Sequence, residues 1–60
     1  MIIQNNNTLV IQNLSKNTRL TLIRQNGLVI NFTNELGETF TVAKLDKNYV
    51  NQLVTFLFGG

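Results

Sequence analysis

Few side chains in this sequence could carry out acid–base or nucleophilic chemistry. Its 60 residues include no histidine and no cysteine, so the commonest general base, the commonest metal ligand and a thiol nucleophile are all missing. The acids are Glu35, Glu38 and Asp46. Catalytic carboxylate pairs face each other across a cleft, whereas Glu35 and Glu38 flank a predicted hairpin tip. Asp46 directly precedes a helical pattern, where a carboxylate caps free backbone amides.

The other groups that could react also lack partners. Ser15 is the only serine, and it stands beside Lys16 in a predicted turn with no histidine to activate its hydroxyl. The Asn-Gly and Leu-Gly pairs at 26–27 and 36–37 are typical of hairpins and do not form a glycine-rich phosphate loop before a helix. We therefore expect a non-enzymatic chain with no catalytic residue, no metal site and no cofactor.

The composition is poor in charge. Charged residues make up 13% of the chain, against about 25% in typical domains. Ten asparagines supply much of the polar surface, as in proteins from low-GC bacterial or phage genomes, so we expect a phage or mobile-element source. No secretory pattern follows Met1, and the longest apolar stretch, 53–58, is too short to span a bilayer. These features predict a cytoplasmic chain without a membrane partner.

Four runs rich in leucine, isoleucine, valine, threonine and phenylalanine predict β-strands at 8–14, 18–24, 28–33 and 38–44. Asn, Gly and Ser clusters separate these runs, and the chain has no proline. The spacing predicts an antiparallel β-meander. Whether residues 1–3 pair as a short fifth strand stays open.

Two glycine loops predict how the strands align. A three-residue loop at 25–27, with Gly27 left-handed, places Leu22 opposite Ile30 and Leu20 opposite Phe32. A second three-residue loop at 35–37, with Gly37 left-handed, places Phe32 opposite Phe40 and Ile30 opposite Val42. Both loops independently gather the same apolar residues on one face of the sheet. These are Leu20, Leu22, Leu28, Ile30, Phe32, Phe40 and Val42.

The sequence leaves the register of the first hairpin open and predicts only the general character of the other sheet face. Around 15–17 the register is ambiguous, so either Leu9 and Ile11 or Val10 and Leu14 join the apolar residues. The opposite face is mostly polar, as expected for a one-sided antiparallel sheet. Its expected members are Arg19, Thr21, Ile23, Gln25, Val29, Asn31, Thr33, Thr39 and Thr41.

A helix is predicted at 47–58, with Asp46 as N-cap. At 100° per residue its main apolar stripe contains Tyr49, Val50, Leu53, Phe56 and Leu57. Val54 and Phe58 lie beside that stripe and widen the apolar arc to roughly 200°, more than the usual stripe of about 100°. One sheet face does not easily cover such an arc. We therefore expect Val54, Phe58 and Leu57 to form an oligomer interface.

These elements predict one α+β domain spanning residues 1–60. It consists of an antiparallel four-stranded meander followed by one C-terminal helix packed on one sheet face. A chain of this size buries only about 60% of the surface of its unfolded form. Such chains usually need a disulfide, a metal or a partner subunit. With the first two missing, self-association as a homodimer or larger oligomer is the expected solution.

The basic residues are Lys16, Arg19, Arg24, Lys44 and Lys47. Four antiparallel strands followed by a helix, with Leu45 and Asp46 leading into Tyr49, Val50 and Leu53, resemble the DNA-binding domain of positive-cofactor-four type transcriptional coactivators. The resemblance covers residues 8–57 in the order of elements and 44–53 in pattern. The resemblance implies a dimer that holds single-stranded DNA along its sheets. From their charge, the five basic residues are the expected phosphate contacts of such a domain. The chain departs from that family in having few basic residues.

Two functions are therefore expected, in this order. The first is a small homo-oligomeric protein-interaction or structural module, whose polar sheet face or free strand edge would meet another protein. The second is a single-stranded nucleic-acid-binding domain. Phosphate contacts weaken steeply with salt whereas apolar contacts do not, so salt dependence separates the two.

Overall fold

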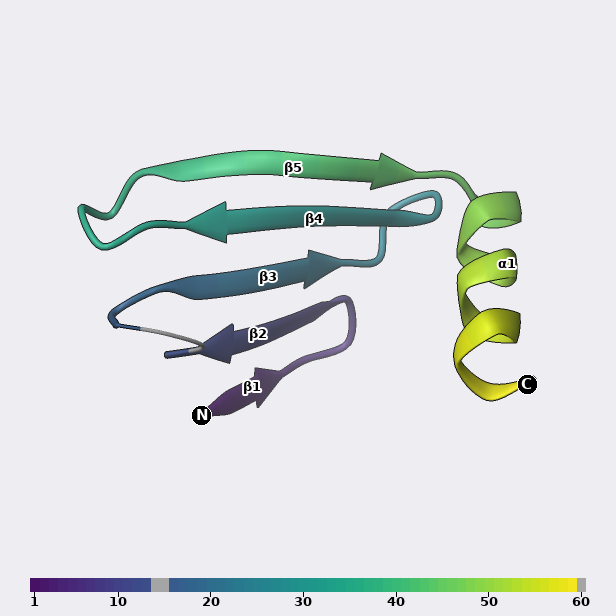
Figure 1. Cartoon of the computed structure of the whole chain (residues 1–60), viewed down its shortest axis with the longest axis horizontal. Coiled ribbons are helices and arrows are strands. Elements are labelled where there is room, and N and C mark those ends of the chain that lie inside the picture. Colours follow the sequence, from purple (N-terminus) through teal and green to yellow (C-terminus); the bar gives the residue numbers. More distant parts are fainter. Residues whose placement is uncertain (14–15, 60) are drawn as a thin grey trace.

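The computed structural model of the chain describes residues 1–13 and 16–59. Its elements are five strands and one helix: β1 (Ile2–Gln4), β2 (Thr8–Gln12), β3 (Arg19–Ile23), β4 (Leu28–Thr33), β5 (Thr39–Leu45) and α1 (Lys47–Phe58). Each strand pairs antiparallel with the next, so the sheet follows chain order (Figure 1). The α+β fold is confirmed, and β1 is the extra N-terminal strand that the sequence left open. The expectations for Leu14 and for a turn at Ser15 lie outside the described residues.

The predicted register between β3 and β4 is confirmed. Leu20 lies opposite Phe32, and Leu22 lies opposite Ile30. The ambiguous first hairpin is also resolved, because Leu9 pairs with Leu22 and Ile11 pairs with Leu20 in the next strand. Leu9 and Ile11 therefore join the apolar residues. A leucine-rich band runs across the three central strands as a result.

Between β4 and β5 the sequence predicts only part of the register. Phe32 lies opposite Phe40 as expected, but Ile30 lies opposite Ala43 rather than Val42. The register shifts between Ile30 and Asn31, so β5 contains one extra residue at this point. A β-bulge of this kind changes which side chains share a face beyond it. It places Leu45 opposite Leu28 and Lys44 opposite Val29. Lys44 therefore lies on the face of the sheet opposite to the one that the predicted register gives it, where it would pair with Leu28.

The pairing and the two-residue period of strands define two faces. The apolar face carries no charged residue within the strands; it consists of Ile2, Gln4, Leu9, Ile11, Leu20, Leu22, Leu28, Ile30, Phe32, Phe40, Ala43 and Leu45. The polar face is mostly threonine, asparagine and basic residues; it consists of Ile3, Thr8, Val10, Gln12, Arg19, Thr21, Ile23, Val29, Asn31, Thr33, Thr39, Thr41 and Lys44. The expected one-sided sheet is therefore present.

Both glycine loops have left-handed backbone. Gly27 has φ +126° and follows Asn26 at φ 51°, while Gly37 has φ +83°. In the second loop the side-chain oxygen Oδ1 of Asn34 accepts hydrogen bonds from the N–H groups of Leu36 (2.9 Å) and Glu38 (3.0 Å). The side chain of Asn34 thus closes the loop that sets the β4–β5 pairing.

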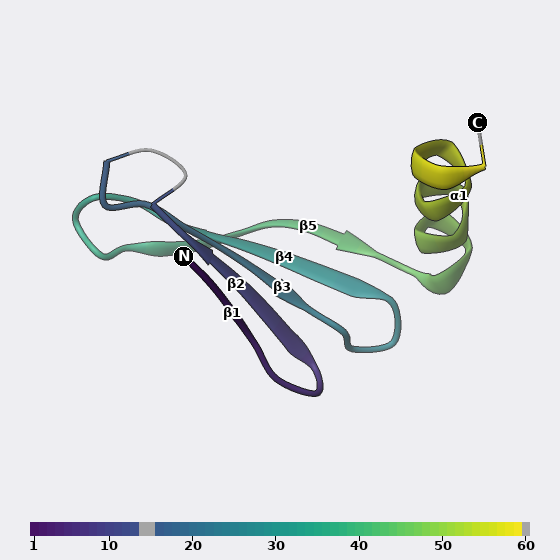
Figure 2. The same ribbon diagram turned by 90° about the horizontal axis from the view of Figure 1, so that it is seen from below.

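The helix has the predicted limits. Oδ1 of Asp46 accepts a hydrogen bond from the N–H of Tyr49 at 3.0 Å, which satisfies a free amide of the first turn. Asp46 is also the only residue between β5 and α1. The helix contacts the sheet through β5. In Figures 1 and 2 it lies beyond the ends of the strands, while the strands fan out from one another.

The sheet and helix leave the molecule without a closed core. Among the described residues no apolar side chain is buried, and Thr18 is the buried polar residue. The strands β2 and β4 are half-buried throughout, whereas β5 is mostly exposed. Within residues 1–13 and 16–59, no helix has the length and apolar character needed to cross a membrane.

Gly27 is expected to be the more sensitive of the two loop glycines. A Cβ at Gly27 would overlap the carbonyl oxygen of Leu45 and lie 2.9 Å from the Cα of Asp46, whereas a Cβ at Gly37 meets nothing within 4 Å. Gly37→Ala should cost about 1 kcal/mol of unfolding free energy through backbone strain alone. Gly27→Ala should cost about 3 kcal/mol or more, because backbone atoms must also move. Urea unfolding at a fixed chain concentration measures both, and equal losses would contradict this account of the β5–α1 corner.

Candidate protein-interaction surface

Among the described residues, the largest group of exposed apolar side chains on one element lies on α1. No residue of the helix is buried, and the only charged residue in it is Lys47 at its start. Large side chains with high exposure include Phe58 (83%) and Phe56 (79%). Because contiguous exposed apolar patches of this kind mark interaction sites on soluble proteins, α1 is the first candidate for a functional surface.

The three residues predicted to form the interface are together on this helix. Leu57 and Phe58 follow Val54 by three and four positions, so they lie on the same side of α1. Their exposures are 48% for Val54, 60% for Leu57 and 83% for Phe58. The structure therefore leaves the predicted interface residues free to contact another molecule.

The exposed apolar stripe of α1 is wider than the sequence predicts and consists of Tyr49, Leu53, Val54, Phe56, Leu57 and Phe58. Tyr49, Leu53 and Phe56 were expected to be covered by the sheet, yet each is exposed. Val50 is the helix residue that is half-buried. Val50 lines a groove of about 270 Å³. Gly27, which lies in the turn between β3 and β4, lines the same groove. The reason is the position of α1, which meets the sheet near its own first turn and extends past the strand ends (Figure 2).

The apolar face of the sheet is the second uncovered surface. Its residues in β2, β3 and β4 are half-buried, which is what cross-strand neighbours alone provide in a single layer. On β5 the exposure is higher, with Phe40 51% exposed. Val42, the extra residue at the bulge, is also exposed. An apolar face without a covering layer is rare in a stable domain.

The polar face satisfies many of its own hydrogen bonds. The hydroxyls of Thr33 and Thr39 lie 2.9 Å apart, across β4 and β5. The hydroxyl of Thr41 donates to Oδ1 of Asn31 at 2.8 Å. These cross-strand pairs hold the side chains in place on the polar face. The face therefore presents an ordered, uncharged surface between its basic ends.

The five predicted nucleic-acid contacts are exposed but only two of them come together. Arg24 and Lys47 line the groove between α1 and the β3–β4 turn. Arg24 also donates from its guanidinium Nη2 to the carbonyl of Asn6 at 2.8 Å. The sequence offers no signal for this pairing, because it depends on where α1 sits.

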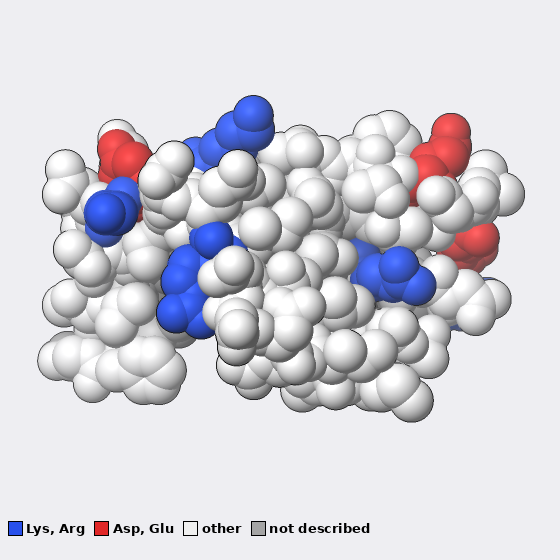
Figure 3. All heavy atoms as spheres, turned by 180° about the vertical axis from the view of Figure 1, so that it is seen from behind, with Lys and Arg blue, Asp and Glu red and all other residues white. Residues whose placement is uncertain are grey.

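The remaining basic residues are spread out. Arg19 and Lys44 share the polar face but lie opposite Thr33 and Val29 of β4, so about 13 Å of strand separates them. Lys16 lies before β3, outside any strand. Figure 3 shows basic side chains separated by uncharged surface on the face in view. No continuous basic track, such as a bound phosphate backbone would follow, is present on that face.

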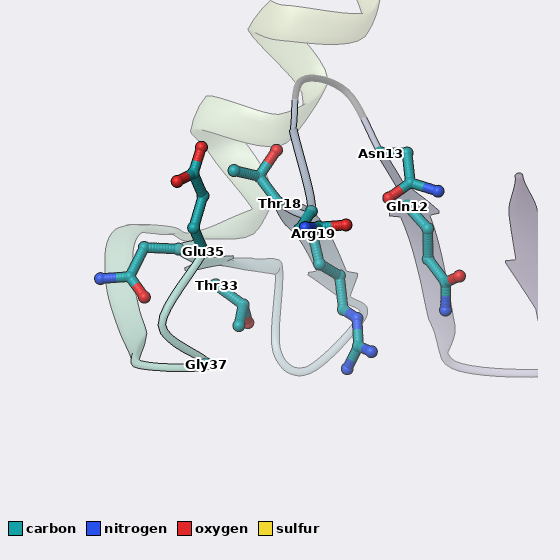
Figure 4. Close-up of a pocket in the computed structure, with 9 residues that line it drawn as sticks. Gln12, Asn13, Thr18, Arg19, Thr33, Glu35 and Gly37 are labelled. Atoms are coloured by element: carbon teal, nitrogen blue, oxygen red, sulfur yellow. The ribbon is translucent and has the colours of Figure 1, made fainter.

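A shallow polar depression lies at the end of the sheet opposite α1. It has a volume of about 270 Å³ and is lined by Gln12, Asn13, Asn17, Thr18, Arg19, Thr33, Asn34, Glu35 and Gly37. Figure 4 shows the guanidinium of Arg19 and the carboxylate of Glu35 pointing away from each other. The depression is smaller than the usual range of about 300–1,000 Å³ for small-molecule sites. Its two charges are not arranged for a shared proton or a shared ligand.

The three acids have structural contacts or solvent around them. Glu38 accepts a hydrogen bond at Oε1 from the side-chain amide of Asn34, at 2.9 Å. Asp46 caps the helix, and Glu35 is exposed at the loop. Across residues 1–13 and 16–59, the acids form no group of three that could hold a metal ion.

The uncovered apolar surfaces are thus the feature of the structure that most needs a functional explanation. Comparison of the chain with protein-family models, with curated proteins and with solved structures found no match. A function for the chain therefore has to be argued from its own surfaces, chiefly the stripe of α1 and the apolar face of the sheet.

Proposed function

We propose that this chain is a small, non-enzymatic protein-interaction module that works as a homo-oligomer through the apolar stripe of α1. The observation that carries the proposal is the exposure of that stripe, including Val54, Leu57 and Phe58. Burying such side chains contributes about 1.5–3 kcal/mol each. A partner surface that covers the stripe would therefore supply a large part of the stability that a chain of 60 residues lacks.

The length of the helix supports the same proposal. α1 has 12 residues, and isolated helices shorter than about 12–15 residues are marginal in water. Helices of this length are held mainly by apolar contacts with neighbouring elements. Here the contact with β5 is small and the helix buries no residue. An intermolecular contact would give α1 the support that its own sheet does not.

A module of this kind retains surfaces for a further protein. β5 is an edge strand of seven residues, and its outer backbone groups have no neighbouring strand. Edge strands accept extended segments of other proteins by main-chain hydrogen bonding. The polar face beside it adds threonine and asparagine side chains that could select among partners.

Replacing Val54 with aspartate should dissociate the oligomer. Light-scattering mass on a sizing column should show wild-type protein well above the 6.8 kDa of one chain. Val54→Asp should move the mass toward that value, with a dissociation constant at least about 100-fold higher, because an unpaired carboxylate would be buried in an apolar contact.

Gln52→Asp is the matched control. It places the same charge on the same exposed helix, outside the apolar stripe, and should leave the mass unchanged. Circular dichroism of both variants reports whether the strands remain. An oligomer that survives Val54→Asp would rule out the helix stripe as its interface.

Salt and DNA should affect the oligomer little. Apolar contacts persist or strengthen at high salt, whereas phosphate contacts weaken steeply. We expect the same mass at low and high salt, with and without a short single-stranded oligonucleotide. A complex with the oligonucleotide that disappears at high salt would instead favour nucleic-acid binding through Arg24, Lys47 and the other basic residues.

A further inference from the structure

The two uncovered apolar surfaces of the chain fit each other in chemical character. The apolar face of the sheet has no charged member within the strands, since the bulge between β4 and β5 places Lys44 on the other side. The helix has no charge after Lys47. Two chains of net charge +2 can therefore bring these surfaces together with no charge in the middle of the contact. Arg24 borders the apolar face, in a hollow that it lines with Leu22 and Leu28, and so lies at the margin of that contact.

The connection between β5 and α1 keeps the helix at the end of its own sheet. Asp46 is the only connecting residue, whereas strand–helix connections commonly have about two to six. Its side chain caps the first turn, and Gly27 lies so near that a Cβ added there would be 2.9 Å from the Cα of Asp46. Short connections of this kind favour the exchange of an element between copies, because the element cannot easily turn back onto its own chain.

The exposed area matches what a dimer would cover. The chain has an accessible surface of 4879 Å², whereas a monomeric protein of its mass is expected to expose about 4,000 Å². The excess is therefore about 900 Å² per chain, or about 1,800 Å² for two copies. Stable protein interfaces bury about 1,200–2,000 Å² in total. The excess thus corresponds to one standard interface between two copies.

We propose that two copies associate reciprocally, with α1 of each copy packed on the apolar face of the other. This inference rests on the proposed homo-oligomer and names its partner surface. The exchange gives the sheet the covering layer that it lacks, and it gives the helix stripe a sheet to pack on. The arrangement is closed by a two-fold axis, because each copy both donates a helix and receives one.

Thiol cross-linking tests which surfaces meet. The chain has no cysteine, so Leu53→Cys marks the helix stripe and Ile30→Cys marks the apolar face in separate, otherwise native chains. One variant is labelled with nitrogen-15, the two are mixed in equal amounts, and a short bismaleimide is added. Mass spectrometry then separates mixed from like pairs. We expect mixed pairs to exceed either like pair at least fivefold, and Gln52→Cys in place of Leu53→Cys to give few mixed pairs.

Other cross-linking patterns would overturn the exchange. An excess of like pairs of Leu53→Cys would mean that the two helices contact each other. That result would agree with the proposed homo-oligomer but contradict the exchange of helices. A chain carrying both substitutions that links internally would mean that α1 packs on its own sheet. Wild-type protein with the mass of one chain would remove both proposals.

Lengthening the connection provides a second test. Inserting Gly-Ser-Gly between Leu45 and Asp46 should let α1 reach its own apolar face, so that the mass falls from two chains to one while the helix signal in circular dichroism persists. The same insertion between Leu36 and Gly37, in the loop at the other end of β5, should leave the mass at two chains. An unchanged mass for the lengthened connection would contradict the exchange.

Discussion

Pairing between neighbouring strands is the interaction on which the rest of this structure depends. Among the described residues no apolar side chain is buried, so the sheet is held by its backbone ladder and by half-buried cross-strand pairs such as Leu22–Ile30 and Leu20–Phe32. Such pairs contribute about 0.2–1 kcal/mol each. That is small beside the entropy cost of ordering the chain. A single layer of this kind gains most of its remaining stability from whatever covers it.

The bulge in β5 decides the chemical character of both faces. With a regular ladder, Lys44 would lie opposite Leu28 and place an ammonium group at the margin of the apolar face. The extra residue at Val42 instead brings Leu45 opposite Leu28 and turns Lys44 to the polar side. One inserted residue thus keeps the apolar face uncharged up to the start of the helix.

Local signals in the sequence predict those parts of the structure that depend on local physics. Gly27 and Gly37 fix two loops because only glycine adopts their backbone without strain, and the loops fix the β3–β4 register and part of the next one. Asp46 fixes the start of α1 because a carboxylate satisfies its free amides. The bulge has no such signal, since no glycine or proline marks Val42. The periodicity of α1 shows which side chains share a stripe, but the surface that covers them depends on a non-local contact. For the same reason the sequence could not bring Arg24 and Lys47 together.

Reciprocal exchange would also determine which surfaces remain available to a third molecule. In the proposed dimer both apolar faces turn inward, so both polar faces turn outward. Each polar face has its Thr33–Thr39 and Thr41–Asn31 pairs already hydrogen-bonded across β4 and β5. The edge of β5 would stay free, because a helix on the sheet face does not use the strand's outer backbone groups. Two identical edges related by a two-fold axis can bind two extended segments at once, which raises the effective affinity for a paired partner without any new contact. A small chain with few charges would in this way obtain a specific binding surface from the symmetry of its own assembly.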